Sequence, residues 1–128
     1  MTTEAFADSD RDGCIRAFQR AHEECLSALA HCMDRPALET SGDLYQCLLD
    51  CADLCRTAAD FLSRASKLSS KICVLASAAC DDLVTACRRH ADDARLREVS
   101  RTARQTAGAC IPLTRPTIDQ TLVAEEDR

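Results

Sequence analysis

The stretch CLLDCADLC at residues 47–55 constrains the fold more than any other feature, because its three cysteines are spaced four residues apart. Residues at this spacing are neighbours on one face of an α-helix, with Cβ atoms roughly 5–6 Å apart. Two thiolates at that separation can hold one soft metal ion between them. Cys47, Cys51 and Cys55 therefore predict a helix that carries a ladder of thiols along one face.

The composition favours an all-α protein of a single domain. The 128 residues include only three glycines and three prolines, and the formal net charge of −5 argues against nucleic acid as a partner. No apolar run approaches the roughly 18 residues of a membrane span, and the N-terminus carries no secretory signal. We therefore expect a cytoplasmic protein with no membrane partner, in a reducing compartment where cysteines more often bind metals than form disulfides.

Hydrophobic periodicity predicts four amphipathic helices joined by short links, which is typical of an antiparallel up-down four-helix bundle. The predicted parts of the chain are a flexible N-terminus at 1–11, a bundle at 12–111 and a C-terminal tail at 112–128. The four helices are expected near residues 12–33, 43–64, 68–90 and 93–111.

Polar residues before each helix are the expected N-caps, since their side chains can accept hydrogen bonds from free backbone N–H groups. Ser9 or Asp10 would cap the first helix, Ser41 or Asp43 the second, and Asp92 the fourth. Pro112 should end the last helix.

The inward positions follow alternating steps of three and four residues, which is the seam pattern of bundle helices. Nine cysteines occupy these seams, and Cys47 flanks them. The seam cysteines are Cys14, Cys25, Cys32, Cys51, Cys55, Cys73, Cys80, Cys87 and Cys110. The other seam positions are mostly apolar, among them Phe18, Leu44, Leu48, Leu83, Leu96 and Val99.

Antiparallel order predicts the depth of each cysteine, because each helical residue rises about 1.5 Å. The cysteines then fall into three layers. The middle layer holds Cys25, Cys51, Cys55 and Cys80; one end holds Cys32, Cys47 and Cys87, with His31 and His90 nearby; the other end holds Cys14 and Cys110, with Cys73 about a turn above them.

Copper(I) is the metal that this pattern predicts best. Soft thiolates select copper(I), zinc or iron–sulfur clusters, but the CxxC pairs and CxxCxxC loops of zinc and ferredoxin sites do not occur here. His90 is a candidate ligand because it follows Cys87 by three residues on the same face. His31 is a weaker candidate, and His22 is expected to be structural.

Three alternatives remain open at this level. The middle cysteines, Cys25, Cys51, Cys55 and Cys80, could hold a single iron–sulfur redox cluster. The chain could be a structural bundle that has lost metal binding, or its even number of cysteines could form a disulfide framework. An enzyme is not expected, because the sequence has no glycine-rich phosphate loop and no activating motif around a nucleophile.

Two segments carry a resemblance to the copper storage protein family: LLDCADLCRTAADFLSRAS at 48–66 and KICVLASAACDDLVTACRRHADD at 71–93. The resemblance covers roughly residues 12–111 and implies a four-helix bundle whose core cysteines bind many copper(I) ions. It also implies the cytosolic branch, in which tetramers are common. Apolar residues stand at many seam positions where the family has thiols, so we expect a lower copper capacity than is typical.

Copper is expected to load from the end that holds Cys32, Cys47, Cys87 and His90. Cys47 lies off the seam, where its thiol can reach solvent. We expect Cys47 to ionise readily beside a histidine, because a partly exposed thiolate in such surroundings is the more reactive kind.

Overall fold

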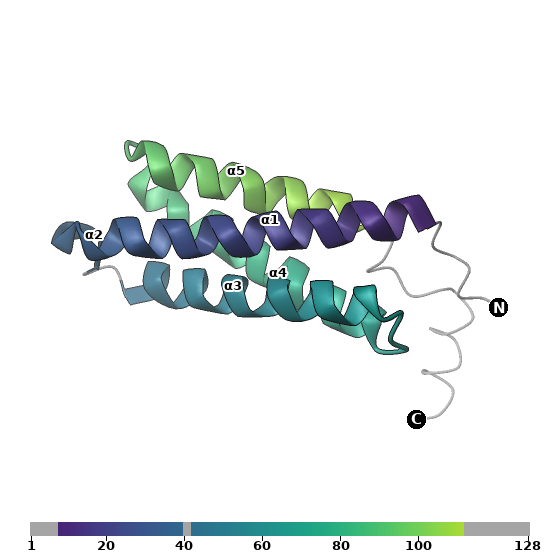
Figure 1. Ribbon diagram of the computed structural model, residues 1–128. Helices are drawn as coiled ribbons and strands as arrows, with labels where there is room; N and C mark the ends of the chain where they lie inside the picture. The colour runs from purple at the N-terminus through teal and green to yellow at the C-terminus, as the bar shows by residue number, and fades with distance from the viewer. Residues whose placement is uncertain (1–7, 40–41, 112–128) are drawn as a thin grey trace, which may run out of the picture.

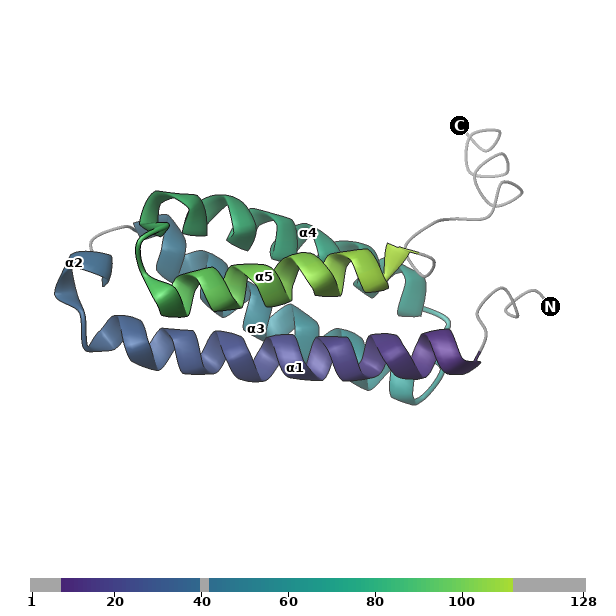
Figure 2. The same ribbon diagram turned by 90° about the horizontal axis from the view of Figure 1, so that it is seen from above.

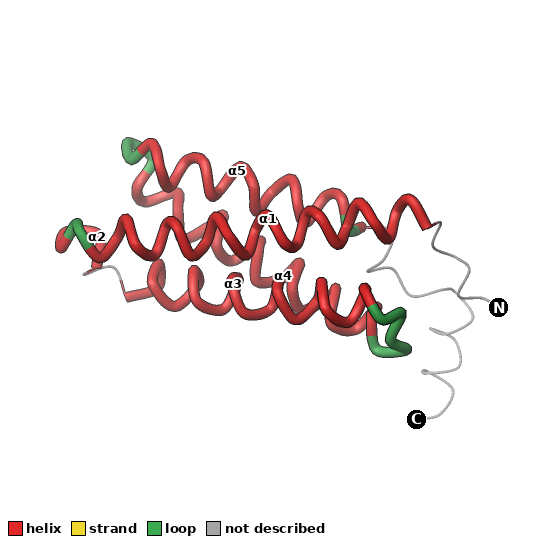
Figure 3. Tube along the Cα trace, in the orientation of Figure 1, coloured by secondary structure: helices red, strands yellow, loops and turns green. Residues whose placement is uncertain are grey.

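The computed structural model describes residues 8–39 and 42–111 and forms a bundle of four long helices (Figure 1). The helical elements are α1 (Asp8–Met33), α2 (Pro36–Glu39), α3 (Gly42–Ser63), α4 (Ser69–Cys87), the 3-10 turn η2 (Arg88–His90) and α5 (Ala94–Ala109). Within the described residues, loops make up only the short links between these elements (Figure 3). The predicted all-α bundle is confirmed.

The long helices form a ring in which α1 contacts α3 and α5, and α4 contacts the same two helices. Both views show the start of α1, the α3–α4 link and the end of α5 together at one end, which we call the Cys14 end (Figure 1, Figure 2). The short α2 and the α4–α5 turn lie at the other end, which we call the Cys87 end. Successive long helices therefore run antiparallel.

The core consists of the predicted seams, because every seam position named from the periodicity is buried. Phe18, Leu44, Leu48, Leu62, Leu83, Leu96 and Val99 are among the largest fully buried side chains. Burying an apolar side chain of this size contributes roughly 1.5–3 kcal/mol. We therefore expect this apolar part of the core to support the bundle without a metal.

Helix α1 begins at Asp8, four residues before the predicted start, so Ser9 and Asp10 lie inside the helix and the prediction that they cap it is wrong. Acidic side chains near a helix N-terminus interact favourably with the helix dipole. Asp10 and Asp12 lie in these first turns and are compatible with the longer helix.

The links contain two elements that differ from the prediction. Pro36 opens α2 where only a turn was expected, because the fixed φ of proline suits the first position of a helix. The third predicted helix continues past Cys87 only as the 3-10 turn η2.

Asp93, and not Asp92, caps α5: its side chain accepts a hydrogen bond from the Leu96 backbone N–H at 3.0 Å. Of the candidate caps of α3, Asp43 lies in the first turn of the helix, while Ser41 and the whole tail at 112–128 fall outside the described residues.

Candidate metal centre

Three thiols converge at the middle of the core. The Sγ atoms of Cys51 and Cys55, on α3, lie 3.8 Å apart, and the Sγ of Cys80, on α4, lies 3.7 Å from Cys51 and 3.9 Å from Cys55. All three residues are completely buried. In the part of the chain that the structure describes, this is the only group of three or more Cys, His, Asp or Glu residues whose ligand atoms come this close together.

The size of this triangle suits a single soft metal ion. A point at its centre lies about 2.2 Å from each sulfur, which is close to the zinc–sulfur bond length of roughly 2.3 Å. An iron–sulfur cluster would need room for several irons and bridging sulfides between its cysteine sulfurs. The three sulfurs are too close together for that, so the geometry favours a single ion over a cluster.

Cys25, on α1, completes the middle layer by a hydrogen bond between its thiol and Cys51. Hydrogen bonds from Cys25, Cys55 and Cys80 lower the pKa of Cys51, against the opposing effect of burial. The same hydrogen bonds to Cys51 and Cys80, together with burial, raise the pKa of Cys55. Hydrogen bonding within the layer therefore favours the thiolate at Cys51 and the protonated thiol at Cys55.

The Cys87 end brings together Cys32, Cys47 and Cys87. Burial is the main cause that raises the pKa of Cys87 to about 12, and the nearby sulfurs of Cys32 and Cys47 add to it. The turn η2 directly follows Cys87 on the chain. His90 is its last residue, three positions after Cys87, and is partly buried. Its role as a metal ligand stays a prediction.

Cys47 is the one cysteine that is only partly buried. It lines a groove of about 210 Å³ between α3 and α4, together with Asp50 and Asp82. Burial raises the pKa of Cys47, and so do the negative charges of Asp82, Asp43 and Asp50. The expectation that Cys47 ionises readily is therefore wrong, because carboxylates next to the thiol disfavour the thiolate. Uptake at this end stays a prediction.

The Cys14 end brings together Cys14, Cys73 and Cys110. Cys14 on α1 and Cys110, the residue that follows α5, have Sγ atoms 2.7 Å apart. Burial raises the pKa of Cys73 to about 12, with a smaller contribution from the charge on Cys14. The structure thus places the ten cysteines in the three layers that the sequence predicts, whereas their role as metal ligands remains to be tested.

Two of the histidines have other partners. The Nδ1 of His22 lies 2.7 Å from the Ala52 carbonyl oxygen, so His22 links α1 to α3, as expected for a structural residue. The Nε2 of His31 lies 3.0 and 3.2 Å from the two carboxylate oxygens of Asp93. These contacts occupy one ring nitrogen of each imidazole.

Sequence reasoning missed the carboxylates around Cys47 and the partner of His31. Asp50 could have been found, because it follows Cys47 by three residues and so shares its face of the helix. Asp82 and Asp93 come from other helices, and no local spacing in the sequence pairs them with Cys47 and His31.

Comparisons with known proteins agree with this arrangement. The family model described as "Copper storage protein" matches residues 7–115, which is most of the chain. No curated protein matches the chain. None of the helices in the described part of the chain combines the length and apolar character that a membrane span requires.

Two solved structures from Streptomyces lividans are similar in fold. One is the copper storage protein Ccsp loaded with 10 copper equivalents, with a TM-score of 0.77 and 22% identity over 83% of this chain and 84% of that chain. The other is a cytosolic copper storage protein with five coppers, with a TM-score of 0.76 and 23% identity over 84% of this chain and 97% of that chain.

Proposed function

The chain belongs to the copper storage protein family, and from this premise we propose that it sequesters or buffers copper(I) in the cytosol through buried cysteine thiolates. The triangle of Cys51, Cys55 and Cys80 sulfurs is the observation that carries the proposal. Thiolates are the ligands that copper(I) prefers. The similar protein that is described as cytosolic and bound to copper supports the location and the metal. The role is storage and not catalysis.

The proposed ligands are the three layers of cysteines. In the middle layer they are Cys25, Cys51, Cys55 and Cys80; at the Cys87 end Cys32, Cys47 and Cys87, with His90; and at the Cys14 end Cys14, Cys73 and Cys110. The middle layer should bind most tightly, because four sulfurs from three helices meet there in a site that water cannot reach.

The copper capacity is lower than in a bundle whose seams are filled with thiols. Large apolar side chains occupy seam positions between the layers, and α5 itself carries no cysteine. Such a core holds its ions in separate groups. A homo-oligomer, which the resemblance implied, is part of the proposal, and light scattering on purified protein would test it.

An anaerobic titration tests the function. Reduced, metal-free protein is titrated with copper(I) in the presence of a coloured copper(I) chelator, and bound copper is counted by elemental analysis. The expected result is that several copper ions per chain bind before the chelator takes up any. Failure to compete with the chelator would leave a purely structural bundle. A brown product that contains iron after anaerobic purification would favour the cluster alternative.

A further inference from the structure

The two thiols at the Cys14 end are much closer together than any other sulfurs whose separation the structure gives. The Sγ atoms of Cys14 and Cys110 are 2.7 Å apart, whereas the three middle-layer separations are 3.7–3.9 Å. The two cysteines are 96 positions apart in the sequence, and they join the first long helix to the end of the last. Both are completely buried.

The backbone holds both thiols in this position. Cys110 ends α5, and its backbone N–H donates to the Thr106 carbonyl oxygen at 3.2 Å. The Cys14 thiol also lies 3.4 Å from the Ala109 carbonyl oxygen, as a donor. Cys110 therefore sits at a helix end, where local opening costs less than in the middle of a helix.

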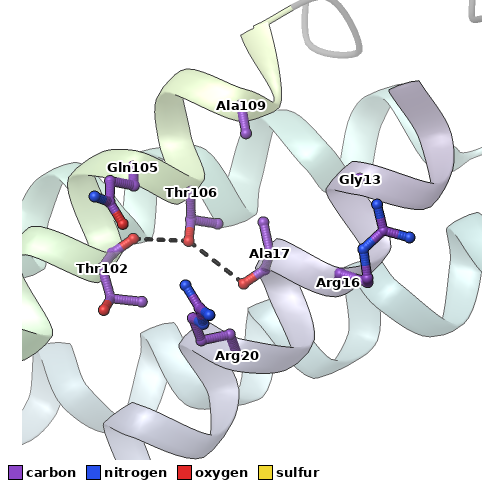
Figure 4. Close-up of a pocket in the computed structure, with 8 residues that line it drawn as sticks. All are labelled: Gly13, Arg16, Ala17, Arg20, Thr102, Gln105, Thr106 and Ala109. Carbon is purple, nitrogen blue, oxygen red and sulfur yellow. Dashed lines mark hydrogen bonds between the residues drawn. The ribbon is translucent and has the colours of Figure 1, made fainter. Parts of the chain in front are cut away.

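A groove between α1 and α5 lies next to this pair, lined by residues adjacent to both cysteines in the sequence. It has a volume of about 370 Å³, and its lining includes Gly13 and Ala109, the residues directly before Cys14 and Cys110. Figure 4 shows Gly13 and Ala109 on the two walls of the groove, together with the hydrogen bonds from Thr106 to Thr102 and Ala17. A side chain at Gly13 would meet no atom within 4 Å, so this part of the groove is open.

We propose that Cys14 and Cys110 are a redox-active pair that forms a reversible disulfide by exchange with a low-molecular-weight disulfide. One protein thiolate attacks the small disulfide, which breaks its S–S bond and releases one small thiol. The second protein thiol then loses its proton and displaces the other half as a second small thiol. Two protein thiols and one small disulfide thus become one protein disulfide and two small thiols.

The Cys51–Cys55 pair of the middle layer is a poorer candidate for this reaction. Cys51 and Cys55 share one helix, where residues four apart have Cβ atoms roughly 5–6 Å from each other. A disulfide requires a Cβ separation of about 3.5–4.5 Å. Oxidation of that pair would therefore distort α3, whereas Cys14 and Cys110 lie on different helices and Cys110, at the end of α5, can adjust.

The consequence for metal binding rests on the proposed function. A closed disulfide removes Cys14 and Cys110 from the potential copper ligands and leaves Cys73 without a thiol partner at that end. The middle layer and the Cys87 end keep all their thiols. The redox state of the pair therefore sets the number of copper ions that the protein holds, and reduction restores it.

The first experiment tests the disulfide without copper. The reduced full-length protein is incubated with oxidised glutathione, quenched with acid, and analysed by thiol counting in denaturant, intact mass and peptide mapping. We expect the ten thiols to fall to eight, the mass to drop by about 2 Da as two hydrogens are lost, and the peptides of Cys14 and Cys110 to be linked. An unchanged thiol count, or links among other cysteines, would overturn the proposal.

Two variants and a control sharpen this result. Cys14→Ser and Cys110→Ser should each prevent the linked peptide and leave the remaining cysteine carrying a glutathione adduct. Cys73→Ser, the matched control at the same end, should still form the link. A linked peptide that persists in Cys14→Ser, or one that vanishes in Cys73→Ser, would contradict the assignment of the pair.

The second experiment counts bound copper in the reduced and the oxidised protein, under anaerobic conditions and without added thiol. The oxidised protein should bind fewer ions, and dithiothreitol treatment followed by its removal should restore the number. An equal number in both forms would overturn the effect on capacity while leaving the disulfide itself intact. If neither form binds copper, the proposed storage function fails, and the peptide map still decides the disulfide.

Discussion

The His31 imidazole lies 3.0 Å from the Asp93 carboxylate, and this contact joins the last turn of α1 to the N-cap of α5. Asp93 serves two partners, because one of its carboxylate oxygens also accepts the Leu96 backbone N–H. The pair therefore fixes the Cys87 end of the bundle on the side where the first and last long helices meet.

Replacing Asp93 with Ala should lower the free energy of unfolding by about 1–2 kcal/mol, the usual cost of losing an N-cap together with its charge. Chemical denaturation followed by circular dichroism measures the change. Asp92→Ala is the matched control, because Asp92 is exposed and precedes the cap, and its effect should stay within about 0.5 kcal/mol. Equal effects of the two variants would show that the cap does not stabilise α5.

The Asp93 carboxylate should also make stability depend on pH. Burial alone would raise the pKa of Asp93, but the hydrogen bonds from His31 and from the Leu96 N–H lower it overall. A carboxyl group whose folded pKa is lowered contributes stability above its unfolded pKa of about 3.9. That contribution disappears as the pH falls through the folded pKa.

The matched variant for this effect is Asp93→Asn, since Asn is also a good N-cap and removes only the charge. The stability advantage of the wild type over Asp93→Asn should be present near neutral pH and should shrink as the pH falls from about 5 to 2. Denaturation curves at several pH values measure it. An advantage that grows towards acid would mean that the carboxylate does not stabilise the fold.

The middle layer should dominate copper binding. Under reducing, anaerobic conditions, the double variant Cys51→Ser and Cys55→Ser should lose every ion that the middle layer holds, because two of its four sulfurs are removed. The double variant Cys14→Ser and Cys110→Ser should lose only the ions of one end. Elemental analysis after removal of free copper compares the two. Equal losses would refute the layered arrangement.

Asp82 should control the reactivity of Cys47. Burial raises the pKa of Cys47 most, and Asp82 is the largest of the charges that add to it. Asp82→Asn should therefore speed the alkylation of Cys47 by iodoacetamide at pH 8 roughly two- to fivefold, as more thiolate forms. Asp53→Asn is the control, because Asp53 is an exposed aspartate on α3, the helix that carries Cys47. Mass spectrometry of the Cys47 peptide over time gives the alkylation rate of each variant. Equal rates in Asp82→Asn and Asp53→Asn would mean that Asp82 does not control the reactivity of Cys47.

Ala65 adopts a left-handed conformation with φ of 52°, which side chains other than glycine disfavour. It follows α3 in a Schellman motif, in which Ser66 N–H donates to the Phe61 carbonyl oxygen and Ala65 N–H to that of Leu62. Ala65→Gly should raise the free energy of unfolding by about 0.5–1 kcal/mol, the relief of strain less the added freedom of the unfolded chain.

Ala91→Gly provides the contrast, because Ala91 has an ordinary φ of −64°. The same substitution there should lower stability by roughly 0.5–1 kcal/mol. Thermal and chemical unfolding of the two variants should therefore change in opposite directions. A loss of stability in both would mean that the backbone at Ala65 carries no strain.

The periodicity of the sequence was sufficient to predict the core and the depth of each cysteine. Steps of three and four residues determine which side chains face inward, and the antiparallel order then sets their height, as Cys51 and Cys80 illustrate. The short link after Met33 was harder, because α2 depends on the preference of a single proline for the first helical position.

The atomic neighbours could not be predicted in the same way. Whether Cys14 reaches Cys110, or Cys47 meets Asp82, depends on the rotation of each helix about its own axis. A rotation of a few tens of degrees leaves the seam buried and changes these pairs completely. Packing between helices selects this rotation, and no local spacing in the chain reports it.

The deep burial of the thiols makes copper loading an acid–base reaction as well. Burial raises the pKa of Cys73 and of Cys87 to about 12, so both thiols are protonated in neutral solution. A thiol must give up its proton to become a ligand, and metal binding at such sites therefore releases protons. Copper binding by the proposed ligands Cys73 and Cys87 should therefore acidify the water around the protein, and an acid shift should favour copper release.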